Sequence, residues 1–264
     1  KWELMDPDRL ELKRLLEDWQ LNMQEQNGWN AVFWCNHDQP RIVSRLGDDK
    51  RYWKESAKML AACIHLLRGT PYIYQGEEIG MTNPGFMEIG QYRDVESLNY
   101  YRIMREQGKT EQEALEVLRA RSRDNGRTPM QWSSDKFAGF SDKEPWISIP
   151  DNYQTINAKA QRRDPDSVYA FYQKLIRLRK ERSVIADGQI EFLFREHPDV
   201  MAYRRFHDQE EILAFHNLTK KEVVLPLESG AKEYRLVLGN YGELLTGQGA
   251  LILRPYETAA IEAY

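Results

Sequence analysis

Two short apolar segments separated by a helix pattern constrain the fold of this chain most strongly. Residues 31–35 (Ala-Val-Phe-Trp-Cys) are apolar at every position, and residues 72–74 (Tyr-Ile-Tyr) form a second short run. A strand without polar positions is typical of a parallel sheet that is covered on both faces. Between the two runs, Met59, Leu60, Cys63, Ile64 and Leu67 recur at helical spacing. The order strand, helix, strand predicts a parallel βα architecture.

An amphipathic helix is expected before the first strand. Asp6 would cap this helix and Pro7 would occupy its first position. Its apolar face would contain the residues that recur at helical spacing, namely Leu12, Leu15, Leu16, Trp19 and Met23. Two more helices are expected near residues 111–121 and 166–182, within and after a long insertion near residues 80–160.

The pattern changes after Gly188. Short alternating segments separated by turn residues are typical of an antiparallel β domain. They are residues 190–194, 201–206, 212–217, 222–227, 235–238 and 251–254. The sequence therefore predicts an α/β part at residues 1–184 and an antiparallel β domain at residues 185–264.

Charge and cysteine usage exclude several classes of function. The 37 basic and 41 acidic side chains are interspersed and give a net charge of −4, so neither nucleic acid nor an anionic membrane is an expected partner. Cys35 and Cys63 lie in apolar segments without CxxC spacing, which favours buried free thiols in a reducing cytoplasm over a disulfide or a metal site. A disulfide between them stays the alternative. No uninterrupted apolar run reaches the length of about 18 residues that a membrane span requires.

A polar cluster begins where the first apolar run ends. Asn36, His37 and Asp38 follow that run directly, and Gln39 and Pro40 continue the cluster. In parallel barrels the functional groups lie at the carboxyl ends of strands, so this position favours a function. The alternative is that the polar residues cap the next helix.

The sequence around this cluster resembles the last catalytic signature of the α-amylase family. Residues 33–45 read Phe-Trp-Cys-Asn-His-Asp-Gln-Pro-Arg-Ile-Val-Ser-Arg, in the form found in oligo-1,6-glucosidases and trehalose-6-phosphate hydrolases. Three further blocks, at residues 69–81, 92–99 and 122–132, agree with the family in order and spacing. The resemblance covers essentially the whole chain, although the β domain agrees only in pattern. It implies the C-terminal part of a (β/α)8 TIM barrel, with its last strands and helices, followed by an antiparallel β-sandwich.

The resemblance also implies roles for individual residues. Asp38 would be the carboxylate that binds the glucosyl ring and stabilises the positively charged transition state, and it would not be the nucleophile. His37 would hydrogen-bond the same sugar, and Arg123 would clamp its non-reducing end. Asn36 and Arg41 are the further candidates for substrate binding. No metal site and no cofactor are expected, because hydrolysis by carboxylates requires neither.

The family takes its nucleophile and its general acid from signatures on earlier strands, and neither signature is present. Glu77 and Glu78 do not fit the place of the acid and are expected to form a turn with Gly76. Asp94 and Glu96 are expected to lie in a solvated or salt-bridged loop. Because the chain also begins with a lysine, we expect a C-terminal half that is inactive or insoluble without its N-terminal half.

The resemblance implies the activity of a retaining α-glucosidase, and the two cysteines in apolar segments favour the cytoplasm. Cys35 within its motif favours hydrolysis of trehalose 6-phosphate to glucose and glucose 6-phosphate. The alternative is an oligo-1,6-glucosidase or dextran glucosidase that acts on isomalto-oligosaccharides. A non-catalytic, transporter-associated relative is disfavoured because the Asn-His-Asp motif is retained. Cations that could hold the phosphate are, by composition alone, Lys1, Arg41, Arg45 and Lys50, and the sequence selects none of them.

Overall fold

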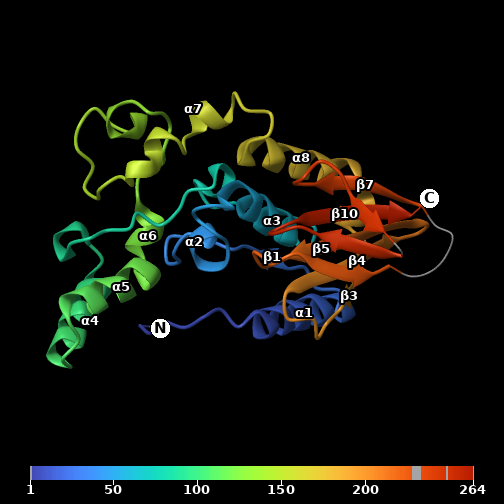
Figure 1. Cartoon of the computed structure of the whole chain (residues 1–264), viewed down its shortest axis with the longest axis horizontal. Helices are drawn as coiled ribbons and strands as arrows, with labels where there is room; N and C mark the ends of the chain where they lie inside the picture. The colour runs from blue at the N-terminus through green and yellow to red at the C-terminus, as the bar shows by residue number, and fades with distance from the viewer. Residues whose placement is uncertain (1, 228–232, 248, 264) are drawn as a thin grey trace. The chain divides into compact units, whose positions relative to one another are not determined.

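The structure is a computed structural model, and it describes residues 2–227, 233–247 and 249–263 (Figure 1). Its α-helices are α1 (Arg9–Glu25), α2 (Ile42–Leu46), α3 (Trp53–His65), α4 (Val95–Glu106), α5 (Glu111–Arg121), α6 (Asp124–Arg127), α7 (Ala158–Gln161), α8 (Val168–Glu181) and α9 (Ser183–Ala186). Its 3-10 helices are η1 (Glu77–Ile79), η2 (Ile89–Gln91), η3 (Lys136–Gly139) and η4 (Asp151–Gln154). Its strands are β1 (Ala31–Val32), β2 (Thr70–Pro71), β3 (Gln189–Leu193), β4 (Val200–His207), β5 (Glu210–Asn217), β6 (Val223–Pro226), β7 (Tyr234–Gly239), β8 (Leu245–Gly247), β9 (Ala250–Leu253) and β10 (Thr258–Ala263).

The chain forms two compact units, each assembled from three segments. The first contains Lys1–Pro7, Trp34–Arg45 and Ile73–Ala170, and the second contains Asp8–Phe33, Leu46–Tyr72 and Phe171–Tyr264. These units are not contiguous in sequence and do not coincide with a division at residue 184. That division stays a prediction.

In the first unit, α4 and α5 pack around one apolar core. Helix α5 occupies the predicted range, because its start is fixed locally: the Thr110 hydroxyl accepts from the Glu113 N–H at 3.2 Å, and Glu113 accepts from the Thr110 N–H at 2.7 Å. Helix α4, which the sequence did not predict, buries Met104 in the same core. The core contains Trp2, Phe86, Tyr92, Met104, Ala114, Leu115, Val117, Leu118 and Ile147.

In the second unit, β1 and β2 form a parallel pair in which Ala31 lies opposite Thr70. The expectation of longer strands that are covered on both faces was wrong. Strand β2 ends before the predicted residues 72–74, and Ala31 and Phe33 are exposed. The physical reason is that this sheet contains only two strands among the described residues, so nothing there covers its second face.

Helix α1 begins two residues later than expected. The Asp8 carboxylate, rather than Asp6, accepts a hydrogen bond from the Glu11 N–H at 2.9 Å and caps the helix. The apolar residues do not form the buried side of this helix, since Leu15 and Trp19 are 53% and 57% exposed.

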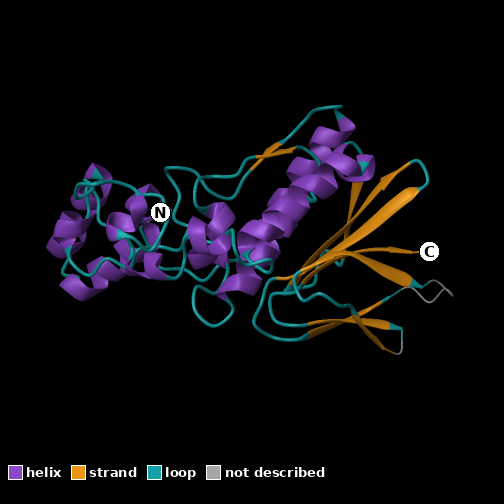
Figure 2. Cartoon of the chain, turned by 90° about the horizontal axis from the view of Figure 1, so that it is seen from above, coloured by secondary structure: helices purple, strands orange, loops and turns teal. Residues whose placement is uncertain are grey.

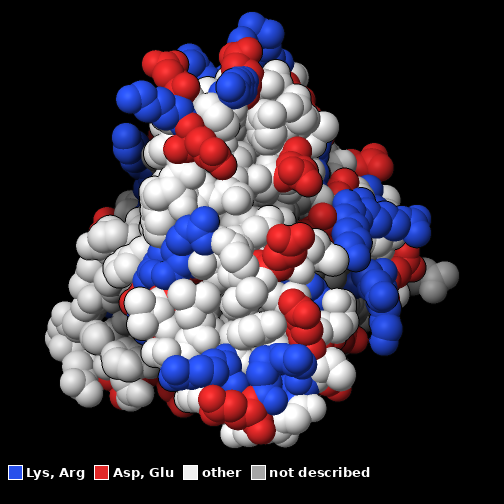
Figure 3. All heavy atoms as spheres, turned by 90° about the vertical axis from the view of Figure 1, so that its left-hand side faces the viewer, with Lys and Arg blue, Asp and Glu red and all other residues white. Residues whose placement is uncertain are grey.

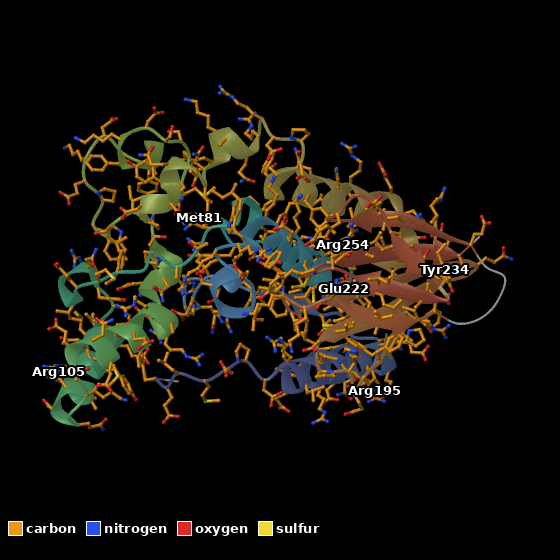
Figure 4. The ribbon with its side chains drawn as sticks, in the orientation of Figure 1. Met81, Arg105, Arg195, Glu222, Tyr234 and Arg254 are labelled. Atoms are coloured by element: carbon orange, nitrogen blue, oxygen red, sulfur yellow. The ribbon has the colours of Figure 1, made fainter. Side chains whose placement is uncertain are left out.

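Polar contacts decide which side of α1 is buried. The Lys13 ammonium donates to the Phe194 and His197 carbonyls at 3.1 and 2.6 Å, and Glu17 pairs with Arg195 at 2.6 Å. Arg195 extends from the connection between β3 and β4 beside α1 (Figure 4). Helix α1 is thus fixed by its hydrophilic side.

The β domain contains two antiparallel sheets, ordered β3-β4-β5-β10-β7 and β6-β9-β8. Strand β4 is apolar on both faces at its start: Val200 and Ala202 enter the core that the two sheets share, whereas Met201 and Tyr203 contact Cys63 of α3. Helices α1, α3 and α9 pack against the five-stranded sheet. Figure 1 labels α1 and α3 beside its strands, and Figure 2 shows helices and strands from above. The prediction of an antiparallel domain is confirmed, and a shared core is consistent with a sandwich.

Two arginines cap the C-terminal end of α3. Arg205 of β4 donates to the Leu66 and Gly188 carbonyls at 2.6 and 2.7 Å, and Arg179 of α8 donates to the His65 carbonyl at 3.0 Å. Helix ends leave carbonyls without intrahelical partners, and they carry partial negative charge. Two guanidinium groups therefore join α3, α8 and the β sheet.

Both cysteines are free and buried, as predicted. Burial raises the pKa of each thiol to about 12. On the face drawn in Figure 3, acidic and basic side chains lie interspersed among uncharged ones. Among the residues that the structure describes, no helix combines the length and the apolarity that a bilayer crossing demands.

The burial of His216 predicts that the folded protein loses stability at acidic pH. His216 contacts the Thr258 and Tyr203 hydroxyls, and burial lowers its pKa from 6.5 to about 3. The unfolded state therefore binds one proton more than the folded state between these pH values. The free energy of unfolding should fall as the pH falls below 6.5, by up to about 1.4 kcal/mol per pH unit.

We expect His216→Gln to be less stable at pH 7 and to lose less stability between pH 6.5 and pH 4.5. Urea unfolding at several pH values measures both effects. His207→Gln, which changes a half-exposed histidine, is the control. Equal pH dependence in the His216→Gln variant and the unaltered protein would contradict the prediction.

Candidate active site

Asp38 lies in the first unit with its side chain 43% exposed and with cations on two sides. Its Oδ1 is 2.8 Å from Nη2 of Arg127 and 3.6 Å from Nε of Arg123. Its Oδ2 is 3.7 Å from Nε2 of His37. The structure thus brings together Asp38, His37 and Arg123, three of the predicted site residues.

A hydrogen-bonded turn presents this carboxylate. The Asn36 side-chain oxygen accepts from the Asp38 N–H at 2.8 Å, and the Asn36 carbonyl accepts from the Gln39 N–H at 3.2 Å. Helix α2 begins only at Ile42, so the cluster does not cap it. The role of Asn36 in the structure is to hold the turn, and its role in substrate binding stays a prediction.

Gly126 allows α6 to approach this turn closely. A Cβ atom at this position would lie 2.5 Å from the Gln39 carbonyl oxygen and 3.2 Å from that of Asn36. Both distances are shorter than normal contacts, so a larger residue would displace the turn or the helix. The close approach places the residues at both ends of α6 beside Asp38.

These residues are two arginines four positions apart. Arg123 precedes α6 and Arg127 ends it. Each is held by a carboxylate at the start of α4: Arg123 Nη2 is 2.8 Å from Glu96, and Arg127 Nη1 is 3.2 Å from Asp94. The expectation of a salt-bridged segment at Asp94 and Glu96 is confirmed, but the segment begins a helix rather than forming a loop.

The cations determine the ionisation of Asp38. Desolvation alone would raise its pKa, but the hydrogen bond from Arg127 and the charge of Arg123 outweigh it, and the pKa lies below its usual value. The carboxylate is therefore ionised at neutral pH. An exposed anion fixed in this way is suited to binding a hydroxyl group or to stabilising a neighbouring positive charge.

Arg41 lies elsewhere in the unit and is buried, with 1% of its surface exposed. Its Nη1 donates to the Gln75 carbonyl at 2.5 Å, and its guanidinium lies over the Tyr74 ring. This geometry favours a structural role. The expectation that Arg41 binds substrate stays a prediction that its burial does not support.

Glu77 and Glu78 lie in the turn that the sequence predicted. They belong to η1, which Gly76 and Gly80 flank in left-handed conformations with φ of 86° and 70°. Burial is the largest influence on Glu78 and raises its pKa. The turn expected for these residues is confirmed, and their structural role stays a prediction.

A hollow of about 780 Å³ lies between the N-terminal segment and the helices α4 and α5. Its lining residues are Trp2, Glu3, Leu4, Tyr100, Ile103, Met104, Gln107, Lys109, Glu113, Glu116 and Val117. None of the predicted site residues lines it. Trp2 links the two regions, because its indole N–H donates to Glu96 at 3.3 Å.

Sequence reasoning missed Arg127, whose contact with Asp38 is shorter than that of Arg123. The available signal was the spacing of the two arginines, since residues four apart on a helix project from the same side. The carboxylates at positions 94 and 96 provided a matching pair. Only the fold brings the arginines into contact with both these carboxylates and Asp38.

The site contains one part of the chemistry of glycoside hydrolysis. Retaining hydrolysis requires a nucleophilic carboxylate and a protonated acid roughly 5 Å apart across the glycosidic bond. Asp38 supplies one carboxylate, and its ion-pair partners among the described residues are His37, Arg123 and Arg127. Of all the residues that the structure describes, no three His, Cys, Asp or Glu side chains form a group that could hold a metal ion.

Comparisons with known proteins agree with the resemblance that the sequence motifs indicate. The family model described as the α-amylase catalytic domain matches residues 1–188, and the model of the α-amylase SusG C-terminal domain matches residues 200–259. The chain is 48% identical to a trehalose-6-phosphate hydrolase of Bacillus subtilis over 98% of its length, which is 46% of that relative. It is 44% identical to an oligo-1,6-glucosidase of Halalkalibacterium halodurans over 97% of its length, again 46% of the relative.

Among solved structures, the trehalose-6-phosphate hydrolase of Bacillus licheniformis superimposes with a TM-score of 0.96 at 48% identity. The match covers 100% of this chain and 48% of that structure. The chain therefore spans about half the length of the relatives that it matches.

Proposed function

This chain belongs to the α-amylase family of glycoside hydrolases, and we propose that it is the C-terminal half of a retaining α-glucosidase. The complete polypeptide, by which we mean this chain joined to the N-terminal part that precedes it, would release glucose from an α-glucoside. The observation that carries the proposal is the exposed Asp38 carboxylate between Arg123 and Arg127. An anion in this position matches the expected need to stabilise a glucosyl cation.

In this proposal the residues of the site have separate tasks. Asp38 binds the ring hydroxyls and stabilises the positive charge that develops on the sugar. His37, whose side chain is 73% exposed, donates to a hydroxyl of the same ring. Arg123 binds the non-reducing end, which limits the product to single glucose units. The N-terminal part supplies the nucleophile and the general acid.

The proposed architecture follows from the family. Residues 1–184 would form the last strands and helices of a (β/α)8 barrel, and residues 185–264 would form a β-sandwich. The N-terminal part would cover the exposed side of α1 and the residue that follows β1, where Trp19 and Phe33 are 57% and 48% exposed. Two free, buried thiols support a reducing compartment, and we propose the cytoplasm.

Trehalose 6-phosphate is the proposed substrate, with glucose and glucose 6-phosphate as products. The support is the 48% identity to trehalose-6-phosphate hydrolases over almost the whole chain. The second candidate is the hydrolysis of isomalto-oligosaccharides, which the 44% identity to an oligo-1,6-glucosidase supports. Neither activity would require a cofactor or a membrane partner.

We expect the complete polypeptide to hydrolyse trehalose 6-phosphate with a higher kcat/KM than isomaltose, and this chain alone to turn over neither. Enzymatic assay of released glucose measures turnover, and NMR of the first product anomer tests retention. The chain alone serves as the control, because it lacks two of the three expected carboxylates.

Each outcome has a definite meaning. Preference for isomaltose would replace the proposed substrate with the second candidate. Absence of turnover on both substrates would contradict the proposed enzyme. Glucosidase turnover by a soluble, monomeric preparation of this chain would contradict the proposed division of the catalytic groups.

A further inference from the structure

The Arg127 guanidinium is engaged on all three of its nitrogens. Its Nη2 contacts Asp38 at 2.8 Å, its Nη1 contacts Asp94 at 3.2 Å, and its Nε donates to the His37 carbonyl at 2.8 Å. The guanidinium is planar and its donors point in fixed directions. It cannot rotate towards a ligand without breaking at least one of these contacts.

Asp94 is in turn fixed by the backbone. It is 8% exposed, and its Oδ2 accepts from the Ser97 N–H at 3.0 Å and from the Ser97 hydroxyl at 2.9 Å. Its other oxygen, Oδ1, is the one that contacts Arg127. The carboxylate that caps α4 thereby also holds the arginine that holds Asp38.

Arg123 differs from Arg127 in each of these respects. Its Nε lies 3.6 Å from Asp38, which exceeds a hydrogen-bond distance. That Nε is buried without a hydrogen-bond partner among the described residues, and only the Nη2 contact with Glu96 is short. Of the two arginines, Arg127 fixes the orientation of Asp38.

We propose that Arg127 is a positioning residue for the reaction, which holds the Asp38 carboxylate in its productive orientation while Asp94 holds Arg127. The inference rests on the proposed function. It adds residues that act on catalysis through Asp38 and that touch no substrate. A carboxylate misplaced by about 1 Å can cost roughly a hundredfold in rate.

The test is a double-mutant cycle in the complete polypeptide with p-nitrophenyl α-glucoside as the probe. Arg127→Gln should lower kcat by about 10- to 100-fold with little change in KM, because the substrate loses no direct contact. Arg127→Lys should recover only part of the loss, since an ammonium group cannot donate in the three fixed directions in which the guanidinium nitrogens donate. Asp94→Asn, which keeps a capping oxygen and removes the charge, should cost several-fold.

The cycle separates a positioning role from the alternatives. In the Asp38→Asn background, Arg127→Gln should cause less than about a threefold further loss, because its effect passes through Asp38. The acid limb of the kcat/KM profile should also move to higher pH in Arg127→Gln, since the lowered pKa of Asp38 depends on this arginine. A merely structural role would change neither the coupling nor the pH profile.

Arg105→Gln is the matched control, because Arg105 lies at the C-terminal end of α4 and contacts the Lys109 carbonyl (Figure 4). Losses that multiply independently in the cycle, or a rise in KM equal to the fall in kcat, would overturn the inference. Wild-type kinetics in Arg127→Gln would overturn it too. A complete polypeptide without any α-glucosidase activity would instead contradict the proposed function.

Discussion

Replacement of Asp38 by asparagine in the complete polypeptide is expected to lower kcat on trehalose 6-phosphate by about a thousandfold. The amide has nearly the same shape and can still accept a hydrogen bond from Arg127, so the turn at residues 36–39 should persist. It cannot stabilise a developing positive charge, because it is neutral. Removing one preorganised electrostatic group from an active site typically costs about 10²- to 10³-fold.

Steady-state kinetics and thermal unfolding of the same preparation measure the effect. The loss should appear in kcat more than in KM, because the missing interaction is strongest in the transition state. Glu106→Gln, at an exposed position of α4, controls for the loss of one carboxylate. An Asp38→Asn enzyme that keeps kcat within tenfold and unfolds normally would contradict the role proposed for Asp38.

Replacement of Arg205 by methionine is expected to lower the free energy of unfolding by about 3 kcal/mol. The side chain is fully buried, and it donates to the Leu66, Gly188 and Gln189 carbonyls at 2.6, 2.7 and 3.2 Å. Methionine fills much of the volume but leaves these carbonyls without a donor, and each unsatisfied buried group costs roughly 1–3 kcal/mol. Burial lowers the pKa of Arg205 to about 10, so it is charged at neutral pH.

Urea unfolding of the complete polypeptide tests this second expectation. Arg204→Met is the matched control, because Arg204 is the next residue of β4 and points to the opposite, partly exposed face. There it pairs with Glu191 and Glu211, and we expect a change below about 1 kcal/mol. Equal losses in the two variants would indicate that the carbonyls find other donors.

Local signals predicted most of the elements. Helix α5 has the bounds that the sequence predicted, and its start is fixed within four residues, where Thr110 and Glu113 close a capping box. The alternating segments after Gly188 likewise predicted β3, β4, β5, β6, β7 and β9. These patterns involve residues that are close in sequence, so they can be recognised without knowledge of the tertiary structure.

Elements whose structure depends on distant partners were missed. Strand β10 reads Thr-Ala-Ala-Ile-Glu-Ala and has no clear alternation, but it pairs with β5 and β7 on its two sides. The buried side of α1 likewise depends on distant groups. Its orientation is decided by carbonyls 181 and 184 residues away, which accept from Lys13.

The sequence by itself determined the family, the alternation of strand and helix followed by an antiparallel β domain, and the identity of Asp38 and Arg123 as candidates, because each depends on short motifs. The tertiary structure alone decided that Arg127, 89 residues from Asp38, makes the short contact, and that Arg41 is buried. Hydrogen bonds and ion pairs act over only a few ångströms. Which charged side chains come within that distance depends on how the fold brings distant segments together. No local sequence pattern shows which segments these are.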